Sequence, residues 1–170
     1  LGPLEPEQRE VTAILAHSAH TLQARIEQLL RLNASQFDAR SLHLQPTALL
    51  PLLRKIGEEQ RLPARARRVT IGLAGDAPIV QADAGKLHSV FSNLLANAIA
   101  FSPTGGHIRI ELRRAGENVV IDCRDEGPGI APDELERIFE PFYQGRRSPP
   151  SSAGGSGIGL AIVREFIGAH

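Results

Sequence analysis

The amino-acid sequence predicts an α/β fold, an α+β two-layer sandwich whose mixed sheet has helices on one face, preceded by a long helix. Three observations predict it. A glycine-free run over 5–33 carries one narrow apolar stripe, which is typical of a helix. Strand and helix patterns alternate from about residue 42. The segment 108–123 has the apolar and polar alternation of a hairpin.

Composition limits both the size of the fold and its function. With 170 residues, of which 42% are apolar, the chain can build one core plus an appended element. The formal net charge is zero, so nothing favours binding to nucleic acid or to an anionic membrane surface. Cys123 is the single cysteine, which excludes an intrachain disulfide and a cysteine zinc cluster.

The sequence contains neither a signal peptide pattern nor an apolar run long enough to cross a bilayer. It has no methionine, even at position 1, so we expect the chain to begin inside a longer protein or to have been processed. We therefore expect any membrane segment of the parent protein to lie outside this chain.

The first segment is a helical pattern whose apolar face needs a partner. A helix with a single seam cannot bury that seam on itself. It could pack on its own domain, but it precedes the domain and does not interleave with it, so we expect a dimerisation helix. This divides the chain into 1–36 and 37–170. The seam consists of Val11, Leu15, Ser18, Leu22, Ile26, Leu29 and Leu32.

The remainder of the chain alternates between the two periodicities. Helix predictions rest on apolar steps of three and four, and strand predictions on β-branched runs between turn residues. The predicted elements are a strand over 42–44, a helix over 47–60 with Thr47 as N-cap, strands over 69–73 and 79–82, a helix over 83–101, hairpin strands over 108–112 and 119–123, a short helix over 132–138, a flexible stretch over 144–155 and a last helix from Gly157.

Asn93 and Asn97 lie four residues apart, so they share one face of the helix over 83–101. Amides beside an apolar face are costly unless they find partners. Two readings are open. The amides could bond to nearby backbone, or an amide oxygen could be the single protein ligand of Mg²⁺, which takes its other oxygens from water and phosphates.

The run Asp-Glu-Gly-Pro-Gly-Ile at 125–130 follows the second hairpin strand. An ionised carboxylate accepts hydrogen bonds and cannot donate, so Asp125 could accept one from the exocyclic amino group of adenine, whereas guanine presents an oxygen there. The alternative is an Asx turn followed by a tight Gly-Pro-Gly bend.

A third glycine-rich run, Gly-Gly-Ser-Gly-Ile-Gly-Leu at 154–160, opens the last predicted helix. Backbone amides at a helix start bind phosphate well. The run is not a Rossmann fingerprint, because no strand precedes it, and it is not a Walker loop, because no Gly-Lys-Ser/Thr follows.

Four stretches in chain order carry a family resemblance. Asn-Leu-Leu-Ala-Asn-Ala (93–98), Asp-Glu-Gly-Pro-Gly-Ile (125–130), Phe-Glu-Pro-Phe-Tyr (139–143) and Gly-Ser-Gly-Ile-Gly-Leu (155–160) resemble the N box, first glycine box, F box and second glycine box of the histidine-kinase branch of the Bergerat-fold (HATPase) family. The third stretch argues against the gyrase, chaperone and mismatch-repair branches. The leading helix resembles the second helix of the dimerisation region of sensor histidine kinases, and 143–147 is similar to the GlrK/QseE-like group.

The resemblance implies a role for each matching residue. Asn97 would coordinate Mg²⁺ on the ATP phosphates, and Asn93 would position the phosphates or a water, as the candidate catalytic residue. Asp125 would bind the adenine amino group, 144–154 would be the ATP lid, and Phe139 with Phe142 would anchor it. The other nucleotide-binding candidates are Gly127, Gly129, Ile130, Phe142, Arg146, Arg147, Gly155, Ser156, Gly157, Gly159 and Leu160.

The sequence departs from the family pattern in three places. Ala100 stands where the family often has Lys or Arg, so Arg146 or Arg147 would have to supply that charge. The glycine turn and final hairpin of the family, which would follow His170, are missing. The phosphoacceptor motif His-Glu-x-x-x-Pro is missing as well, because the histidines at 17 and 20 lack that context.

The resemblance therefore implies the ATP-binding catalytic domain of a sensor histidine kinase, with ATP and Mg²⁺ as cofactors. The intact protein would transfer the γ-phosphoryl group to a histidine and then to an aspartate of a response-regulator receiver domain. It would form a homodimer through the leading helix, and this chain would be the cytoplasmic part of an inner-membrane-anchored protein. The alternatives are a degenerate nucleotide-binding or dimerisation module, which Ala100 favours, and a serine kinase of the anti-sigma type, which the leading helix opposes.

Overall fold

The computed structural model describes residues 5, 8, 11–16, 18, 41–76, 78–146 and 157–170. Residues 11–16 are helical and exposed, with Val11 at 56% and Leu15 at 63% exposure. The remainder of the predicted dimerisation helix, and with it most of the seam, lies outside the described residues.

The larger sheet contains three strands in the order β2-β4-β5. Strand β2 (Thr70–Gly75) runs parallel to β4 (His107–Ala115), and β4 runs antiparallel to β5 (Asn118–Arg124). A second sheet pairs β1 (Gln45–Ala48) with β3 (Ile79–Ala82) in antiparallel fashion. The larger sheet is therefore mixed, as the sequence predicts.

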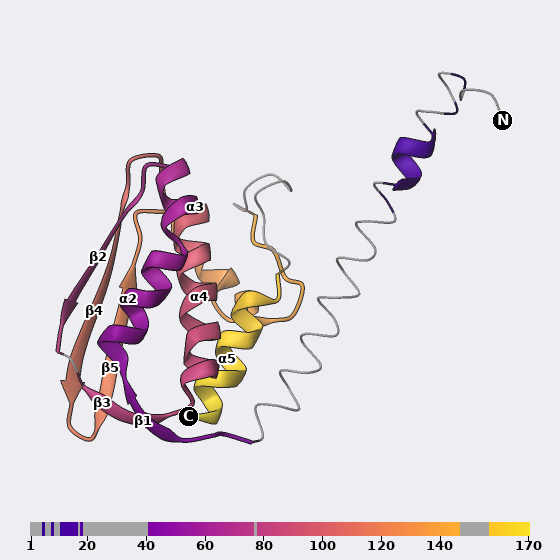
Figure 1. Ribbon diagram of the computed structural model, residues 1–170. Coiled ribbons are helices and arrows are strands. Elements are labelled where there is room, and N and C mark those ends of the chain that lie inside the picture. The colour runs from indigo at the N-terminus through magenta and orange to yellow at the C-terminus, as the bar shows by residue number, and fades with distance from the viewer. Residues whose placement is uncertain are drawn as a thin grey trace.

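The helices lie on one face of the larger sheet (Figure 1). They are α2 (Leu49–Glu59), α3 (Arg61–Ala66), α4 (Ala84–Phe101) and α5 (Gly159–Ala169). Helix α4 packs against α2 on one side and α5 on the other. The predicted two-layer fold class is thus confirmed. In the part of the chain that the structure describes, no helix combines the length and apolarity that a membrane span requires.

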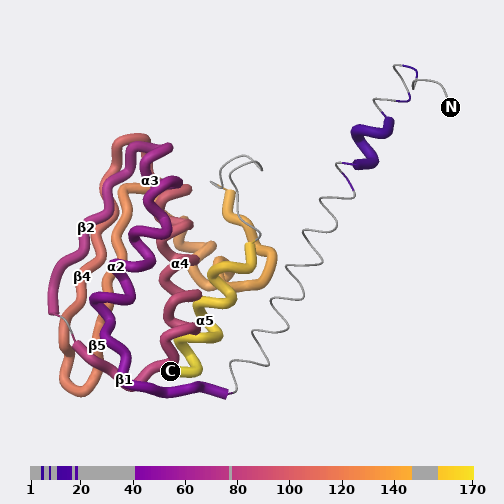
Figure 2. The backbone as a smooth tube through the Cα atoms, in the orientation of Figure 1, coloured from indigo at the N-terminus to yellow at the C-terminus, as the bar shows by residue number. Residues whose placement is uncertain are grey.

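Helices α4 and α5 lie side by side and run antiparallel (Figure 2). The first turn of α5 lies beside the middle of α4, because Gly159 contacts the Asn93 side chain. At the opposite end the C-cap residue of α5, His170, lies beside the first turn of α4, where the Asp83 amide donates to His170 Nε2 (3.0 Å).

A large hydrophobic core holds the two layers together, and a smaller cluster lies at the start of α5. The alternation in β4 points Ile108, Ile110 and Leu112 toward the helices, and each is at most 4% exposed. Helices α2 and α4 contribute Ile56 and Val90, which have no exposed surface. The apolar steps in the sequence therefore predict which faces are buried.

Three predicted elements differ from the structure. The strand predicted over 42–44 is wrong, because β1 occupies Gln45–Ala48 in register with β3, where Pro46 is tolerated in a two-stranded sheet. Thr47 is not the N-cap of α2; its hydroxyl donates to the Ala82 carbonyl (3.1 Å) inside that sheet, and α2 begins two residues later. The helix predicted over 132–138 forms as two 3₁₀ turns, η1 (Pro132–Glu134) and η2 (Arg137–Phe139).

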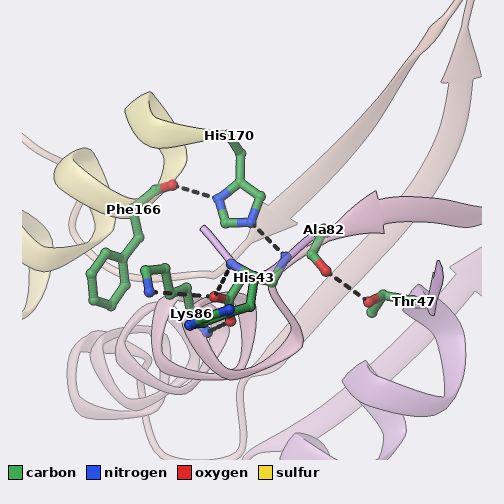
Figure 3. A network of polar contacts seen from close by, with 7 residues as sticks. His43, Thr47, Ala82, Lys86, Phe166 and His170 are labelled. Carbon is green, nitrogen blue, oxygen red and sulfur yellow. Dashed lines mark hydrogen bonds and ion pairs between the residues drawn. The ribbon is translucent and has the colours of Figure 1, made fainter. Parts of the chain in front are cut away.

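A buried ion pair fastens the first turn of α4 (Figure 3). Asp83 caps the helix by accepting from the Lys86 amide (3.0 Å), and its other oxygen accepts from Lys86 Nζ (3.3 Å) and from the His43 amide (3.1 Å). Lys86 Nζ also lies 5.6 Å from the centre of the Phe166 ring. The network therefore joins the segment before β1, α4 and α5.

Candidate functional site

Helix α4 presents the two predicted asparagines to the first turn of α5. Asn93 is half-buried, and its Nδ2 donates to the Ser89 carbonyl (2.9 Å), so the backbone-bonding alternative holds for this amide nitrogen. Its Oδ1 faces Gly159, where a Cβ atom would lie only 2.8 Å away. A side chain at position 159 would therefore require the Asn93 amide or the start of α5 to move.

Asn97 lies one turn further along the same face and is also half-buried. Among residues 41–76, 78–146 and 157–170, no hydrogen bond engages its side chain. An amide oxygen with no partner among these residues is the kind of group that a single-residue Mg²⁺ site uses.

The first turn of α5 provides backbone donors. Its N-cap is Ile158, and no side chain caps the helix in the described part of the chain. The first amides of a helix have no intrahelical acceptor and carry the positive end of the helix dipole. Gly159 and Leu160 thus place backbone amides at a helix start close to Asn93, and such amides are suited to bind phosphate.

The Asp125 loop follows β5 and packs against the C-terminal end of α4, at Phe101. Asp125 Oδ1 accepts from the Gly127 amide (2.7 Å), so the Asx turn given as the alternative is present, and this bond uses only one of the two carboxylate oxygens. A Cβ on Gly127 would lie 2.6 Å from Asp125 Oδ1 and 3.1 Å from the Phe101 carbonyl oxygen. Gly129 has a φ of 68°, and the side chain of Ile130 is 49% exposed beside it.

A second carboxylate in this loop was not predicted from the sequence. Glu126 Oε2 accepts from the backbone amide of His107 (3.1 Å), so it ties the loop to the start of β4. Glu126 therefore accepts a hydrogen bond from the start of β4, whereas Asp125 accepts one within its own turn.

Phe142 and Gly157 are joined through their backbones just before the first turn of α5, and we call this pair the Phe142–Gly157 clamp. The Phe142 amide donates to the Gly157 carbonyl (2.9 Å), and both residues have positive φ, at 67° and 71°. A Cβ on Gly157 would lie 2.7 Å from the Phe142 carbonyl carbon. The Phe142 side chain is 46% exposed, so this residue anchors its segment through its main chain, while Phe139 is half-buried.

Glu134 is a buried acid that was not predicted from the sequence. It is 4% exposed, and its Oε1 accepts from Tyr143 Oη (2.9 Å) and from the Arg146 amide (3.0 Å). The bond from the Arg146 amide, then the bond from Tyr143, lower the pKa of this carboxyl. Nothing in the periodicity marks Glu134, because the 3₁₀ turns around it have no repeating apolar pattern.

The Arg146 guanidinium pairs with Asp133 at the surface (2.5 Å). The side chains of both residues are more than half exposed, so this pair adds little stability. Of the other predicted phosphate ligands, Arg147, Gly155 and Ser156 lie outside the described residues.

The donors around α4 suit a nucleotide better than a protein-only metal centre. Within the described ranges, no cluster of three or more His, Cys, Asp or Glu side chains could hold a metal ion. A divalent cation here would depend on the Asn97 amide, on water and on phosphate oxygens, which is the manner in which Mg²⁺ is usually bound.

Comparisons with known proteins agree with this arrangement. Residues 82–170 match the family model described as histidine kinase-, DNA gyrase B-, and HSP90-like ATPase. The chain is 38% identical over 167 residues to the sensor histidine kinase GlrK of Escherichia coli K12, covering 98% of this chain and 35% of GlrK. It is 31% identical over 163 residues to BaeS of the same organism, a signal transduction histidine-protein kinase, covering 95% of this chain and 35% of BaeS.

Solved structures give the same result. Full-length ShkA, in complex with AMPPNP, matches with a TM-score of 0.75 and 30% identity over 99% of this chain and 35% of ShkA. The mycobacterial sensor histidine kinase MprB matches with a TM-score of 0.64 and 27% identity over 75% of this chain and 80% of MprB.

The chain therefore belongs to the histidine kinase-, DNA gyrase B- and HSP90-like ATPase family. Within it, the fold and the relatives are those of the ATP-binding catalytic domain of a sensor histidine kinase, as the four sequence stretches predicted. The chain spans about a third of the length of the curated relatives that it matches, at 35%.

Proposed function

We propose that this chain binds ATP with Mg²⁺ along helix α4 and supplies the kinase activity of a longer sensor protein. The observation that carries the proposal is that α4 connects two glycine segments, since Gly159 contacts Asn93 and Gly127 contacts Phe101. The eight-residue step between Asn93 and Phe101 spans about 12 Å of helix, so the two glycine segments contact α4 about two turns apart.

The part of α4 between Asn93 and Phe101 has groups suited to the phosphates at one end and to the adenine at the other. Asp125 Oδ2 accepts from the adenine amino group, and the guanine oxygen in that place would be repelled. Asn97 gives its amide oxygen to Mg²⁺, and Asn93 positions the phosphates or the water between them. The backbone amides of Gly159 and Leu160, at the start of α5, hold the phosphate oxygens. Gly155, Ser156 and Gly157 add further phosphate contacts.

Phosphoryl transfer needs mainly positioning and neutralisation of charge, which suits a site with few ionisable groups. The acceptor is a histidine on a separate helix of the intact protein, because neutral imidazole is available near neutral pH. From there the phosphoryl group passes to a response-regulator aspartate. We further infer a homodimer formed by the N-terminal helix, in the cytoplasmic part of an inner-membrane-anchored protein.

Isothermal titration of the chain with ATP and with GTP, in the presence of Mg²⁺, tests the site. We expect Asp125→Ala to weaken ATP binding at least tenfold, which is about 1.4 kcal/mol, and to reduce the preference for ATP over GTP. Asn97→Ala should remove the dependence of affinity on Mg²⁺. Wild-type protein that binds no nucleotide, or variants with unchanged titrations, would contradict the proposal.

A second candidate is a nucleotide-binding module without kinase activity. Two observations favour it: Ala100 puts no charge on the α4 face, and the Arg146 guanidinium is engaged with Asp133. The two candidates separate when the chain is incubated with ATP and the phosphoacceptor helix of its parent protein. Acid-labile phosphate on that helix supports the kinase, acid-stable phosphate a serine kinase, and no phosphate the binding module.

The same titration tests whether Arg146 or Arg147 replaces the charge missing at Ala100. Each arginine is changed to alanine in turn, and the affinity for ATP is compared with that for adenosine. A loss confined to ATP supports a phosphate contact, whereas unchanged ATP affinity in both variants excludes it.

A further inference from the structure

The buried acid Glu134 holds together a segment that borders the candidate site. Both of its described hydrogen bonds reach residues 143–146, from the Tyr143 hydroxyl (2.9 Å) and the Arg146 amide (3.0 Å). Gly145 lies between these two donors, and a Cβ there would be 3.5 Å from Glu134 Oε1. The carboxylate therefore lies inside the bend that this segment makes.

Tyr143 itself is held from two further directions. Its backbone amide donates to the Glu140 carbonyl (3.2 Å), and the Arg137 guanidinium lies 4.5 Å from the centre of its ring. The Glu134 bond thus fixes the end of a side chain whose ring is already positioned. A buried carboxylate with such partners is costly to leave unpaired, so removing either donor disturbs the whole bend.

The fixed segment continues directly into the clamp on α5. Tyr143 follows Phe142, whose amide donates to the Gly157 carbonyl (2.9 Å). Two residues after Gly157, helix α5 begins at Gly159, against Asn93. A continuous chain of contacts therefore runs from Glu134 to the backbone amides proposed to bind phosphate.

We infer that Glu134 is a positioning residue for the phosphate side of the nucleotide site. Its carboxylate fixes residues 143–146, and through the Phe142–Gly157 clamp it sets where the first turn of α5 meets Asn93. Its described hydrogen bonds reach Tyr143 and Arg146 and not the Asp125 loop, so we infer that it acts on the phosphate side through the clamp and not by contact with the nucleotide. The inference rests on the proposed function, because it assigns Glu134 a part in the same site.

The test separates the two ends of the nucleotide. The affinities of the whole chain for Mg-ATP and for adenosine are measured for the wild type, Glu134→Ala, Glu134→Gln and Tyr143→Phe. We expect Glu134→Ala to weaken ATP binding about tenfold and to leave adenosine binding within about twofold. Glu134→Gln should restore most of the ATP affinity, since its amide oxygen accepts the same two bonds.

Tyr143→Phe removes one of the two donors and should weaken ATP binding about threefold, without effect on adenosine. It also carries the test if Glu134→Ala does not fold. The matched control is Glu136→Ala, an exposed acid between the two 3₁₀ turns, for which we expect wild-type affinities.

Equal losses for ATP and adenosine would reduce Glu134 to a structural role, and unchanged ATP affinity in Glu134→Ala or Tyr143→Phe would also overturn the inference. A failure of the proposed function looks different. In that case the wild type itself binds neither ATP nor adenosine, whatever stands at position 134.

Discussion

Asn93 Oδ1 and the Cα atom of Gly159 approach so closely that a Cβ on the glycine would lie 2.8 Å from the oxygen. The contact brings a polar side chain in the middle of α4 against the first turn of α5. It explains why a glycine begins a helix, although glycine is a poor helix former. The contact also fixes the distance between the asparagine pair and the helix amides.

Gly159→Ala should therefore weaken nucleotide binding, even though alanine favours helix. The new methyl group would push the Asn93 side chain from its bond with Ser89 or displace the start of α5. We expect the affinity for ATP to fall about tenfold, or about 1.4 kcal/mol, in an isothermal titration. Gly168→Ala on the same helix is the matched control, because a Cβ there would meet no atom of the described residues within 4 Å. It should add about 0.5–1 kcal/mol to the unfolding free energy and leave ATP affinity unchanged.

Two other glycines share a backbone conformation but not their surroundings. Gly129 and Gly157 have φ values of 68° and 71°. Among the described residues, no atom lies within 4 Å of where a Cβ on Gly129 would be, whereas a Cβ on Gly157 would lie 2.7 Å from the Phe142 carbonyl carbon. Gly129→Ala should cost only the left-handed conformation, about 1–2 kcal/mol, and Gly157→Ala should cost clearly more. Urea denaturation measures both, and equal losses would mean that the Phe142 clamp gives way at no cost.

Periodicity explains which parts of the fold could be predicted. Helix α4 and the β4–β5 hairpin each bury one regular face, so the sequence pattern locates them to within a few residues. Helix α3 was not predicted, since only Ala64 of its six residues is buried and Pro63 lies inside it. Strand β1 was misplaced because its position is set by pairing with β3, not by its own side chains.

The candidate site divides in the same way. Asn93 and Asn97 could be placed on one face because helical spacing alone puts them there. The approach of Asn93 to Gly159 joins residues far apart in the chain, so local patterns do not contain it. Glu134 is the clearest omission, since a Glu in a polar run is usually exposed and only tertiary packing buries this one.

The Asp83–Lys86 pair gives the protein a specific response to acid. Burial alone would raise the pKa of Asp83, but hydrogen bonds from the Lys86 and His43 amides, together with the Lys86 ammonium, lower it to about 2. Because the pKa is lower in the folded state, the pair stabilises the protein above about pH 4, and this contribution is lost as the pH falls toward 2.

Asp83→Asn keeps a capping oxygen but removes the negative charge that Asp83 places beside the buried Lys86 ammonium. We expect a loss of roughly 3 kcal/mol of unfolding free energy at pH 7. The difference from the wild type should shrink between pH 4 and pH 2, as urea denaturation at several pH values would show. Asp122→Asn is the control, because its partner Arg113 is exposed and the change should stay within about 0.5 kcal/mol. A difference that does not vary with pH would mean that the charge of Asp83 is unimportant.

Cys123 lies in β5 two residues before Asp125 and should be a poor nucleophile in the folded protein. Burial, with a smaller effect of the Asp125 carboxylate, raises the pKa of its thiol to about 11. At pH 8 we expect alkylation by iodoacetamide to be on the order of a hundredfold slower in the native chain than in urea. Equal rates would show that the thiolate forms as readily in the folded state as in water.

The same shift has a consequence for stability at alkaline pH. The folded state holds the thiol proton more tightly than the unfolded state, whose pKa is near the ordinary value of 9.0. The wild type should therefore lose stability relative to Cys123→Ala as the pH rises from 9 toward about 11, and show no such trend below pH 8. Denaturation of both proteins across this range measures the difference directly. Because the Asp125 charge is the smaller cause, Asp125→Ala should weaken the alkaline trend only slightly while it abolishes the acceptor proposed for adenine.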